Sequence, residues 1–360
     1  MLYSPVIKSK RGELTALRLL SRETKLSVLP LIDVLPPSPF GDRPKALVDQ
    51  LVWVVAQVVA AWNQEQPLFV DSFDVGPAVL ANQQTPIEYL CRALQANNVK
   101  AIPVTGTQRE ASHDEGVARI AEDFDGGICF RLEREDLLLP KRLPALITQR
   151  LDAFRAIPSK SDLILDLRLL GEDSVEDQTL GLRKALQAIP DVQLWRNVIL
   201  TGSAMPNSLL KVCERGESAF LERREMTIWS ALAAEVIPRY PAFGDYTTVP
   251  PLYADMDTRT IAKHLGPNVK YTLKDQWFIS RGKSFQKFGS NQYFDIAQEI
   301  AALRGFRGPT ASYGERFIAD RASGKIVKSG NPEQWIIASV NSHITYLVNH
   351  LQSRSIVPYK

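Results

Sequence analysis

Charged side chains recur in this sequence directly after short apolar runs, where they could form an acid–base or anion-binding site. Asp33 ends "LPLID", Asp71 follows "PLFV", and Asp166 and Arg168 interrupt "LILDLRLL". Residues two apart in a strand point to the same face, so Asp166 and Arg168 point together. Carboxylates act as general bases or Mg²⁺ ligands, and arginine holds phosphate groups. Each aspartate taken alone also fits a turn or a helix cap, which is the structural alternative.

The segments that would position these residues follow one pattern, in which a short β-branched run precedes an amphipathic helical stretch. Apolar residues in the helical stretches recur at spacings of three and four. Strands that are buried on both faces and linked by helices pair in parallel. Eight such strands predict an α/β protein with a (β/α)8 TIM-like barrel, and a doubly wound sheet is the alternative. The predicted strands are 27–34, 67–73, 99–107, 126–133, 162–170, 197–204, 242–249 and 269–279.

The barrel is predicted to occupy residues 1–360 as a single domain with additions at both ends. Residues 1–26 are interpreted as an N-terminal cap, because "GELTALRLL" is typical of a short helix that precedes the first predicted strand. The residues after the last predicted strand are too many for one barrel helix. We therefore interpret 283–360 as a C-terminal extension that covers one end of the barrel.

The composition is that of an ordinary soluble protein and excludes several classes. The 360 residues are 45% hydrophobic and 23% charged, and a net charge of +3 is too small to indicate a dedicated nucleic-acid binder. Three cysteines without CxxC spacing give neither a disulfide framework nor a zinc cage. No signal peptide is predicted, and the apolar stretch 51–62 is too short to cross a bilayer. We expect a cytoplasmic protein with no membrane association.

The histidines and the known nucleotide motifs add little. None of the four histidines belongs to an HxH, HExxH or HxxxH motif, so we assign no metal-ligating residues. His343 and His350 share a face of a predicted helix, and His343 lies two residues after Asn341. The cofactor stays open, with Mg²⁺ on the strand-end carboxylates as the candidate.

Both ends of the chain carry motifs of a known family. "YSPVIKSKRGELTAL" followed by "PLIDV", and "SYGERFI…SGNPEQWIIASVNSHITYLVNHL", resemble the two terminal signatures of the beta protein family of bacteriophages and bacterial genomes. Glu315 stands where that family usually has Asp, and Ser342 stands where it usually has His. The positions that match the family pattern are Lys8, Gly12, Glu13, Asp33, Asp71, Gly314, Asn331, Trp335, Asn341 and His343.

The resemblance implies a role in defence against phage, but it implies no established activity. Combined with the strand-end residues, it gives two sets of candidate site residues. The candidate catalytic residues are Asp33, Asp71, Asp166, Arg168 and His343, and the candidate ligand-binding residues are Lys8, Glu13, Arg131, Lys274, Glu315 and Asn341.

Three functions remain open from the sequence. The first is an anti-phage enzyme that acts on a phosphate-bearing or nucleotide-like substrate at the polar mouth of the barrel. The second is a non-catalytic sensor or adaptor that binds a phage protein or a defence-associated nuclease. The third is an accessory protein that binds nucleic acid through the basic segments "KSKRG", 221–226 and 281–289. In the last of these, basic residues alternate with phenylalanines.

Overall fold

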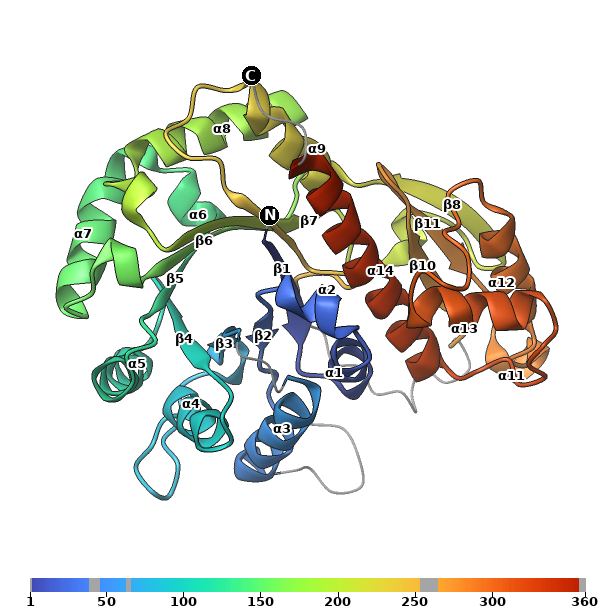
Figure 1. Ribbon diagram of the computed structural model, residues 1–360, viewed down its shortest axis with the longest axis horizontal. Helices are drawn as coiled ribbons and strands as arrows, with labels where there is room; N and C mark the ends of the chain where they lie inside the picture. The colour runs from blue at the N-terminus through green and yellow to red at the C-terminus, as the bar shows by residue number, and fades with distance from the viewer. Residues whose placement is uncertain (1, 39–45, 63–65, 253–264, 356–360) are drawn as a thin grey trace.

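The computed structural model describes residues 2–38, 46–62, 66–252 and 265–355 (Figure 1). Eight parallel strands close into a barrel in the order β1-β2-β3-β4-β5-β6-β7-β9. This confirms the predicted α/β (β/α)8 TIM-like barrel. The barrel strands are β1 (Tyr3–Lys8), β2 (Leu31–Asp33), β3 (Leu68–Asp71), β4 (Ala101–Gly106), β5 (Cys129–Glu133), β6 (Asp162–Leu169), β7 (Asn197–Ser203) and β9 (Ala242–Asp245).

The strand that closes the barrel is β1, which the sequence did not predict as a strand. Tyr3–Lys8, interpreted as part of a cap over residues 1–26, is the first barrel strand and pairs with both β2 and β9. It is buried at every position, as a strand between two neighbours must be. The rest of that segment forms α1 (Arg11–Arg18) and α2 (Arg22–Leu26) on the outside of the barrel.

The predicted eighth strand, 269–279, is likewise wrong as a barrel strand. It contains two antiparallel strands, β10 (Asn268–Thr272) and β11 (Gln276–Arg281), separated by a turn at Lys274 and Asp275. Together with β8 (Glu217–Glu222) they form a separate sheet in the order β10-β11-β8. The polar pair in the middle of the run was the signal for a hairpin turn.

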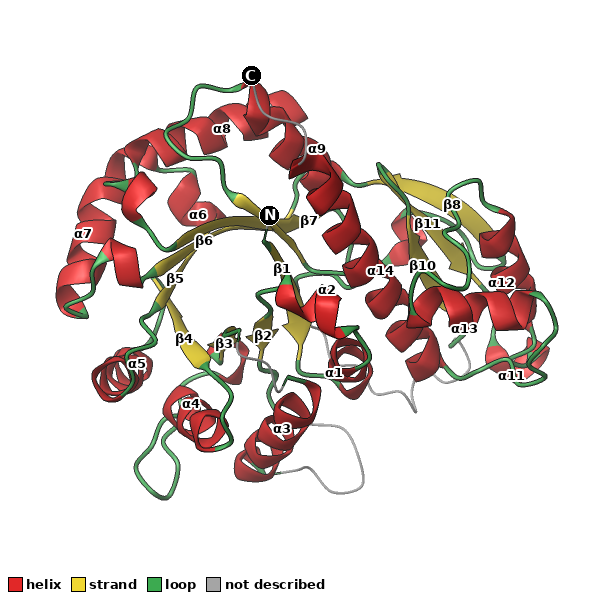
Figure 2. Ribbon diagram, viewed as in Figure 1, coloured by secondary structure: helices red, strands yellow, loops and turns green. Residues whose placement is uncertain are grey.

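Helices surround the barrel as the periodic stretches predicted (Figure 2). The α4 helix begins as expected, since the Thr85 hydroxyl accepts a hydrogen bond from the Glu88 backbone N–H and Pro86 is the first helical residue. Besides α1 and α2, the α-helices between barrel strands in the described residues are α3 (Leu47–Ala61), α4 (Pro86–Ala96), α5 (Ala111–Asp123), α6 (Arg134–Leu137), α7 (Leu143–Ala153), α8 (Val175–Ala188) and α9 (Arg224–Ala231).

The predicted C-terminal extension adds four helices in its described part: α11 (Phe285–Phe288), α12 (Gln292–Ala302), α13 (Tyr313–Ala322) and α14 (Pro332–Ser355). Figure 1 shows α12 and α13 beside the three-stranded sheet, and α14 between this sheet and the barrel. The α14 helix packs against α1 and β1 on the barrel side and against β10 on the other side. It therefore joins the barrel to the added sheet.

Apolar side chains fill the inside of the barrel. One residue or two from each strand contribute, including Val6, Leu31, Phe69, Ile102 and Ile164. A larger core lies between the outer faces of the strands and the helices. Another lies between the added sheet and α12, α13 and α14. This apolar layer is relevant to the site, because the residue two positions later on each strand also points into the barrel.

Candidate functional site

A layer of charged residues lies above the apolar layer, toward the C-terminal ends of the strands. Lys8, Asp33, Asp71 and Asp166 each follow an inward apolar residue by two positions, so they also point inward. The strand register places Lys8 opposite Asp33, and Asp33 opposite Asp71. This end of the barrel is where barrel enzymes carry their active sites. The layer is nonetheless almost completely buried.

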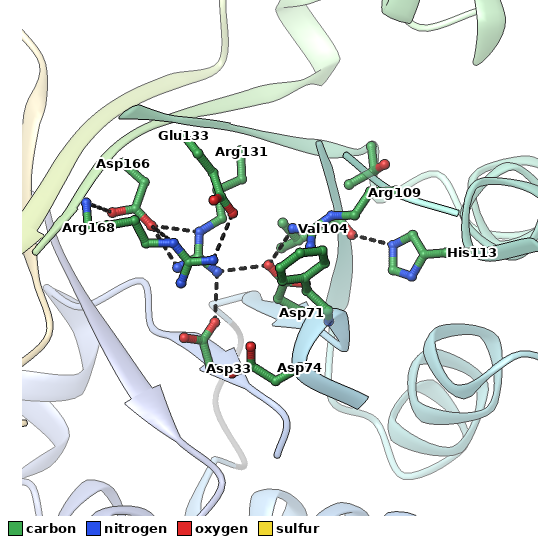
Figure 3. A network of polar contacts seen from close by, with 12 residues as sticks. Asp33, Asp71, Asp74, Val104, Arg109, His113, Arg131, Glu133, Asp166 and Arg168 are labelled. Atoms are coloured by element: carbon green, nitrogen blue, oxygen red, sulfur yellow. Dashed lines mark hydrogen bonds and ion pairs between the residues drawn. The ribbon is translucent and has the colours of Figure 1, made fainter. Parts of the chain in front are cut away.

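Arg131 occupies the centre of this layer (Figure 3). Its Nη1 lies 2.8 Å from Oδ1 of Asp33 and 2.8 Å from Oδ2 of Asp71, and its Nε lies 2.8 Å from Oδ2 of Asp166. Its Nη2 donates to the Tyr246 hydroxyl at 2.7 Å and lies 2.7 Å from Asp166. These contacts engage all three nitrogens of the guanidinium, and four of its five N–H donors form hydrogen bonds. Arg131 therefore holds the layer together.

Each carboxylate around Arg131 has a second partner. Lys8 Nζ lies 2.8 Å from Asp33, and Arg109 Nη2 lies 2.8 Å from Asp71. Burial alone would raise the pKa of Asp33, but Arg131 and Lys8 outweigh burial and hold that pKa well below its usual value. Burial is likewise outweighed at Asp71, where Arg109 and Arg131 lower the pKa. Carboxylates held in the ionised form in this way are weak general bases.

The same geometry argues against Mg²⁺ at this place. Asp33, Asp71 and Asp166 direct oxygens at the Arg131 guanidinium, so a cation at their common centre would meet a positive charge. Among the described residues, no group of three or more His, Cys, Asp or Glu side chains is arranged to hold a metal ion. The donor set does not fit the Mg²⁺ that the carboxylates suggested.

Three aspartates also fix the backbone that follows them, which is the end of the strand at Asp71 and Asp245 and an irregularity within β6 at Asp166. In Asp71, Asp166 and Asp245, Oδ1 accepts a hydrogen bond from the backbone N–H two residues later, at 2.8–3.0 Å. Arg168 and Thr247, which follow Asp166 and Asp245 by two positions, have φ values of +54° and +53°, in a region that non-glycine residues seldom adopt. The same aspartates therefore have both of the roles considered from the sequence, since they fix the local backbone and also contribute to clusters of charged side chains.

Arg168 lies at the rim of the layer. Its Nη2 donates to Oε1 of Glu133 at 2.7 Å, and its Nη1 lies 3.4 Å from the Tyr246 hydroxyl. The Arg168 side chain is 18% exposed, whereas that of Asp166 is fully buried. A ligand that enters the mouth can therefore reach Arg168 and Glu133, but not Asp166.

Sequence reasoning missed Arg109 and Tyr246. Arg109 follows β4 in "GTQRE", and its guanidinium carbon lies 4.2 Å from the centre of the Phe73 ring. Its side chain is 3% exposed, yet Nε and Nη1 have no hydrogen-bond partner within the described part of the chain. Tyr246 donates to Asp166 at 2.6 Å. Arg109 lies beyond the predicted strand 99–107, and Tyr246 lies within the predicted strand 242–249, where no aromatic residue was a candidate.

His343 belongs to a different cluster. Its Nε2 lies 3.0 Å from Oδ2 of Asp245, its Nδ1 lies 2.8 Å from the Thr272 hydroxyl, and its ring stacks on Trp277. The Tyr3 hydroxyl donates to Asp245 at 2.6 Å. Burial lowers the pKa of His343 more than the Asp245 carboxylate raises it, so the imidazole is neutral at pH 7. The structure therefore separates His343 from the carboxylates around Arg131.

The remaining candidates lie around the extension and α1. Glu315 accepts hydrogen bonds from Arg307 and Ser342, and Asn341 links α14 to α13 and α1 by bonding the Gly314 N–H and the Ala16 carbonyl. Lys274 lies in the turn between β10 and β11. These three residues do not join the mouth.

Glu13 lies nearer to the barrel and accepts a hydrogen bond from the Lys8 backbone N–H at 2.8 Å. Burial raises the pKa of Glu13 to about 7. Through the Lys8 backbone, Glu13 supports the end of β1 and lies outside the ring of carboxylates.

The basic segments proposed for nucleic acid are partly used within the fold. Arg223 is fully buried beside Trp277, and Arg281 donates to the Cys213 carbonyl. Lys283 lies 5.5 Å from the centre of the Phe288 ring. Because these cations already have intramolecular contacts, the alternating basic and aromatic pattern of 281–289 is explained without nucleic acid.

Comparison with known proteins gives the family. A family model described as "Beta protein" matches residues 3–349. The chain belongs to the Beta protein family. "Protein beta" of Enterobacteria phage P4 is 22% identical over 346 residues, which are 95% of this chain and 91% of the phage protein. The resemblance drawn from the two ends of the sequence is thereby confirmed.

Similarity to solved structures adds no functional information. The enoyl reductase domain of MlnA from the macrolactin biosynthesis cluster of Bacillus amyloliquefaciens aligns with a TM-score of 0.38 and 12% identity. The alignment covers 98% of this chain and 81% of that chain, and a score this low supports no argument. Across the described residues, no helix combines the length and apolar character needed to span a bilayer.

Proposed function

We propose that this member of the Beta protein family recognises a phosphate-bearing, nucleotide-like ligand at the mouth of its barrel. The observation that supports this most directly is Arg109, a buried guanidinium with two N–H-bearing nitrogens that lack partners among the described residues. A buried donor without a partner costs about 1–3 kcal/mol, and more when it is charged. An anion bound at the mouth would satisfy these donors.

Neighbouring groups suit the same ligand. Arg168 at the rim is partly exposed, and Phe73 offers an aromatic ring beside Arg109. Glu133 and Asp74 are also partly exposed, with side-chain exposures of 19% and 30%. They could accept hydrogen bonds from the hydroxyl or amino groups of a nucleotide. The mouth therefore has guanidinium groups that can donate hydrogen bonds to a phosphate, and separate carboxylates that can accept hydrogen bonds from the rest of a nucleotide.

Recognition is better supported than acid–base catalysis. The candidate catalytic residues Asp33, Asp71 and Asp166 are buried and paired with Arg131, and His343 lies in another cluster. These properties suit a fixed framework more than a group that must exchange protons with a substrate. The function we propose is thus a ligand-recognising sensor, with enzymatic turnover of the ligand as the alternative.

The proposed biological setting is defence against phage, within the cytoplasm, and with a protein partner such as a nuclease that responds to ligand binding. Its support is the family membership and the relative in phage P4. A plaque assay on cells that express the wild-type protein or Arg109→Gln tests this setting. Equal plaque numbers with and without the wild-type protein would argue against defence.

The ligand itself is tested by isothermal titration calorimetry with inorganic phosphate, mononucleotides and cyclic nucleotides. Removing a charged hydrogen-bond donor costs about 1.5–3 kcal/mol, so Arg109→Gln should weaken binding by roughly 10- to 150-fold. The matched control is Arg119→Gln, because Arg119 pairs with Glu88 on the outside of the barrel. The proposal is wrong if the wild-type protein binds none of these compounds, or if Arg109→Gln binds them as the control does.

A further inference from the structure

A hollow of about 730 Å³ lies beside the added sheet, away from the residues of the barrel mouth. Its walls come from the turn between β10 and β11, the segment that follows α12, and single residues of β8 and α14. The residues that define its chemistry are Phe220, Lys274, Asp275, Arg304, Arg307 and Tyr346. The volume is sufficient for a ligand the size of a mononucleotide.

The floor of the hollow is a fixed cation. Arg307 donates from Nε to Glu315 at 2.7 Å, from Nη1 to the Thr272 carbonyl at 2.7 Å, and from Nη2 to the Ser342 hydroxyl at 2.9 Å. Its guanidinium carbon lies 4.5 Å from the Tyr271 ring centre and 4.4 Å from the Tyr346 ring centre. Glu315 and Ser342, which replace the usual residues at two signature positions of the family, thus hold this arginine in place.

The rim of the hollow has cations of a different kind. Lys274 and Arg304 are exposed, and within the described part of the chain their side chains make no hydrogen bond or ion pair. Asp275 is the single acidic residue among those that line the hollow. Lys274 and Arg304 can therefore bind an anion without first breaking an internal contact.

The aromatic residues complete the site. Phe220 is 53% exposed although it belongs to a strand, and its ring centre lies 5.5 Å from that of Phe278 on the neighbouring strand. Tyr346, which lies on α14, also lines the hollow. An exposed ring held by a neighbouring ring is a suitable platform on which a base can stack.

We propose that this hollow is a second binding site, which holds a nucleotide with its phosphate on Lys274 and Arg304 and its base on Phe220. The site is separate from the barrel mouth and does not depend on Arg109. The same chemistry fits a free mononucleotide and a nucleotide within a single strand.

The test compares binding of AMP, ATP and a single-stranded hexanucleotide by isothermal titration calorimetry. The wild-type protein should bind at least one of them, and the double variant Lys274→Ala/Arg304→Ala should weaken that binding at least 10-fold. Phe220→Ser should weaken binding of the nucleotide but not of inorganic phosphate. The control is Lys283→Ala/Lys287→Ala, which removes the same charge from exposed positions outside the hollow.

Tighter binding of the hexanucleotide than of AMP and ATP would identify a single strand as the ligand, and the reverse order would identify a free nucleotide. Arg109→Gln, titrated in parallel, should leave binding at the hollow unchanged and so separates this site from the mouth. The inference is overturned if no compound binds except in an Arg109-dependent way, or if the hollow double variant binds as tightly as its control.

Discussion

Replacing Arg131 by methionine should destabilise the protein more than any other single change in the mouth. Methionine has a similar length but no charge and no donor, so Asp33, Asp71 and Asp166 would each lose a contact of 2.7–2.8 Å. Removing one partner of a buried ion pair costs about 3–5 kcal/mol. Each carboxylate keeps a second partner, so we expect a loss within this range and not a multiple of it.

The loss should depend on pH in a defined direction. Arg131 holds the pKa of Asp33 and Asp71 below the usual value of 3.8, so its stabilising effect is present above pH 3.8 and is lost as the pH falls further. In the Arg131→Met variant Asp33 keeps Lys8 and Asp71 keeps Arg109, but burial is opposed less strongly, so both pKa values should lie higher than in the wild type. The difference between wild type and variant should therefore be largest near pH 7 and should shrink as the pH falls below about 4.

The assay is equilibrium unfolding in urea at several pH values. Lys160→Met is the control, because Lys160 and its partner Asp125 are both exposed and the loss of their ion pair should cost less than about 1 kcal/mol. If Arg131→Met does not fold, Arg131→Lys gives the same information, since lysine keeps the charge but has three donors in place of five. A free energy of unfolding within about 1 kcal/mol of wild type at pH 7 would refute the central role of Arg131.

Two further predictions concern packing and titration. Gly314→Ala would place a Cβ 2.1 Å from the Ala338 carbonyl oxygen and should lower the free energy of unfolding by at least about 2 kcal/mol. Gly181→Ala, whose Cβ would have no atom within 4 Å, should raise it by about 0.5–1 kcal/mol. Thermal unfolding of both variants checks this. Burial raises the pKa of Glu13 from 4.5 to about 7, so its contribution is present below pH 4.5 and is lost as the pH rises to about 7. Glu13→Gln should therefore be more stable than wild type at pH 8 by up to about 3 kcal/mol, with a smaller difference at pH 5, and a difference that does not change with pH would contradict this.

The barrel could be predicted because its strands and helices are encoded locally. Runs such as 27–34 are mostly apolar on both faces, and the helical stretches between the runs show their spacing within a dozen residues. The closing strand could not be found in this way. Tyr3–Lys8 is a strand because it pairs with residues near 243–245, and a contact of that separation leaves no local pattern.

The candidate site was predicted in part for the same reason. These residues come together because Asp33 and Asp71 end β2 and β3, while Arg131 and Asp166 point inward from within β5 and β6, and the C-terminal parts of the strands meet at one edge of a barrel. The structural role of Arg131 could not be predicted from the sequence. A residue type shows which hydrogen-bond donors are present, but not how many of them already bind other residues of the protein. The position of His343 depends on how α14 packs against β9 and β10, which its own sequence does not encode.

The position of β1 has a consequence for the synthesis of the chain. Tyr3 and Asp245 make a direct hydrogen bond although they are 242 positions apart. At about 5–20 residues per second, a ribosome needs roughly 10–50 seconds to make the chain between them. During that interval one edge of β1 lacks its native neighbour, and an unpaired strand edge is a template for aggregation. Production of the soluble protein should therefore respond to chaperone levels and to the rate of translation.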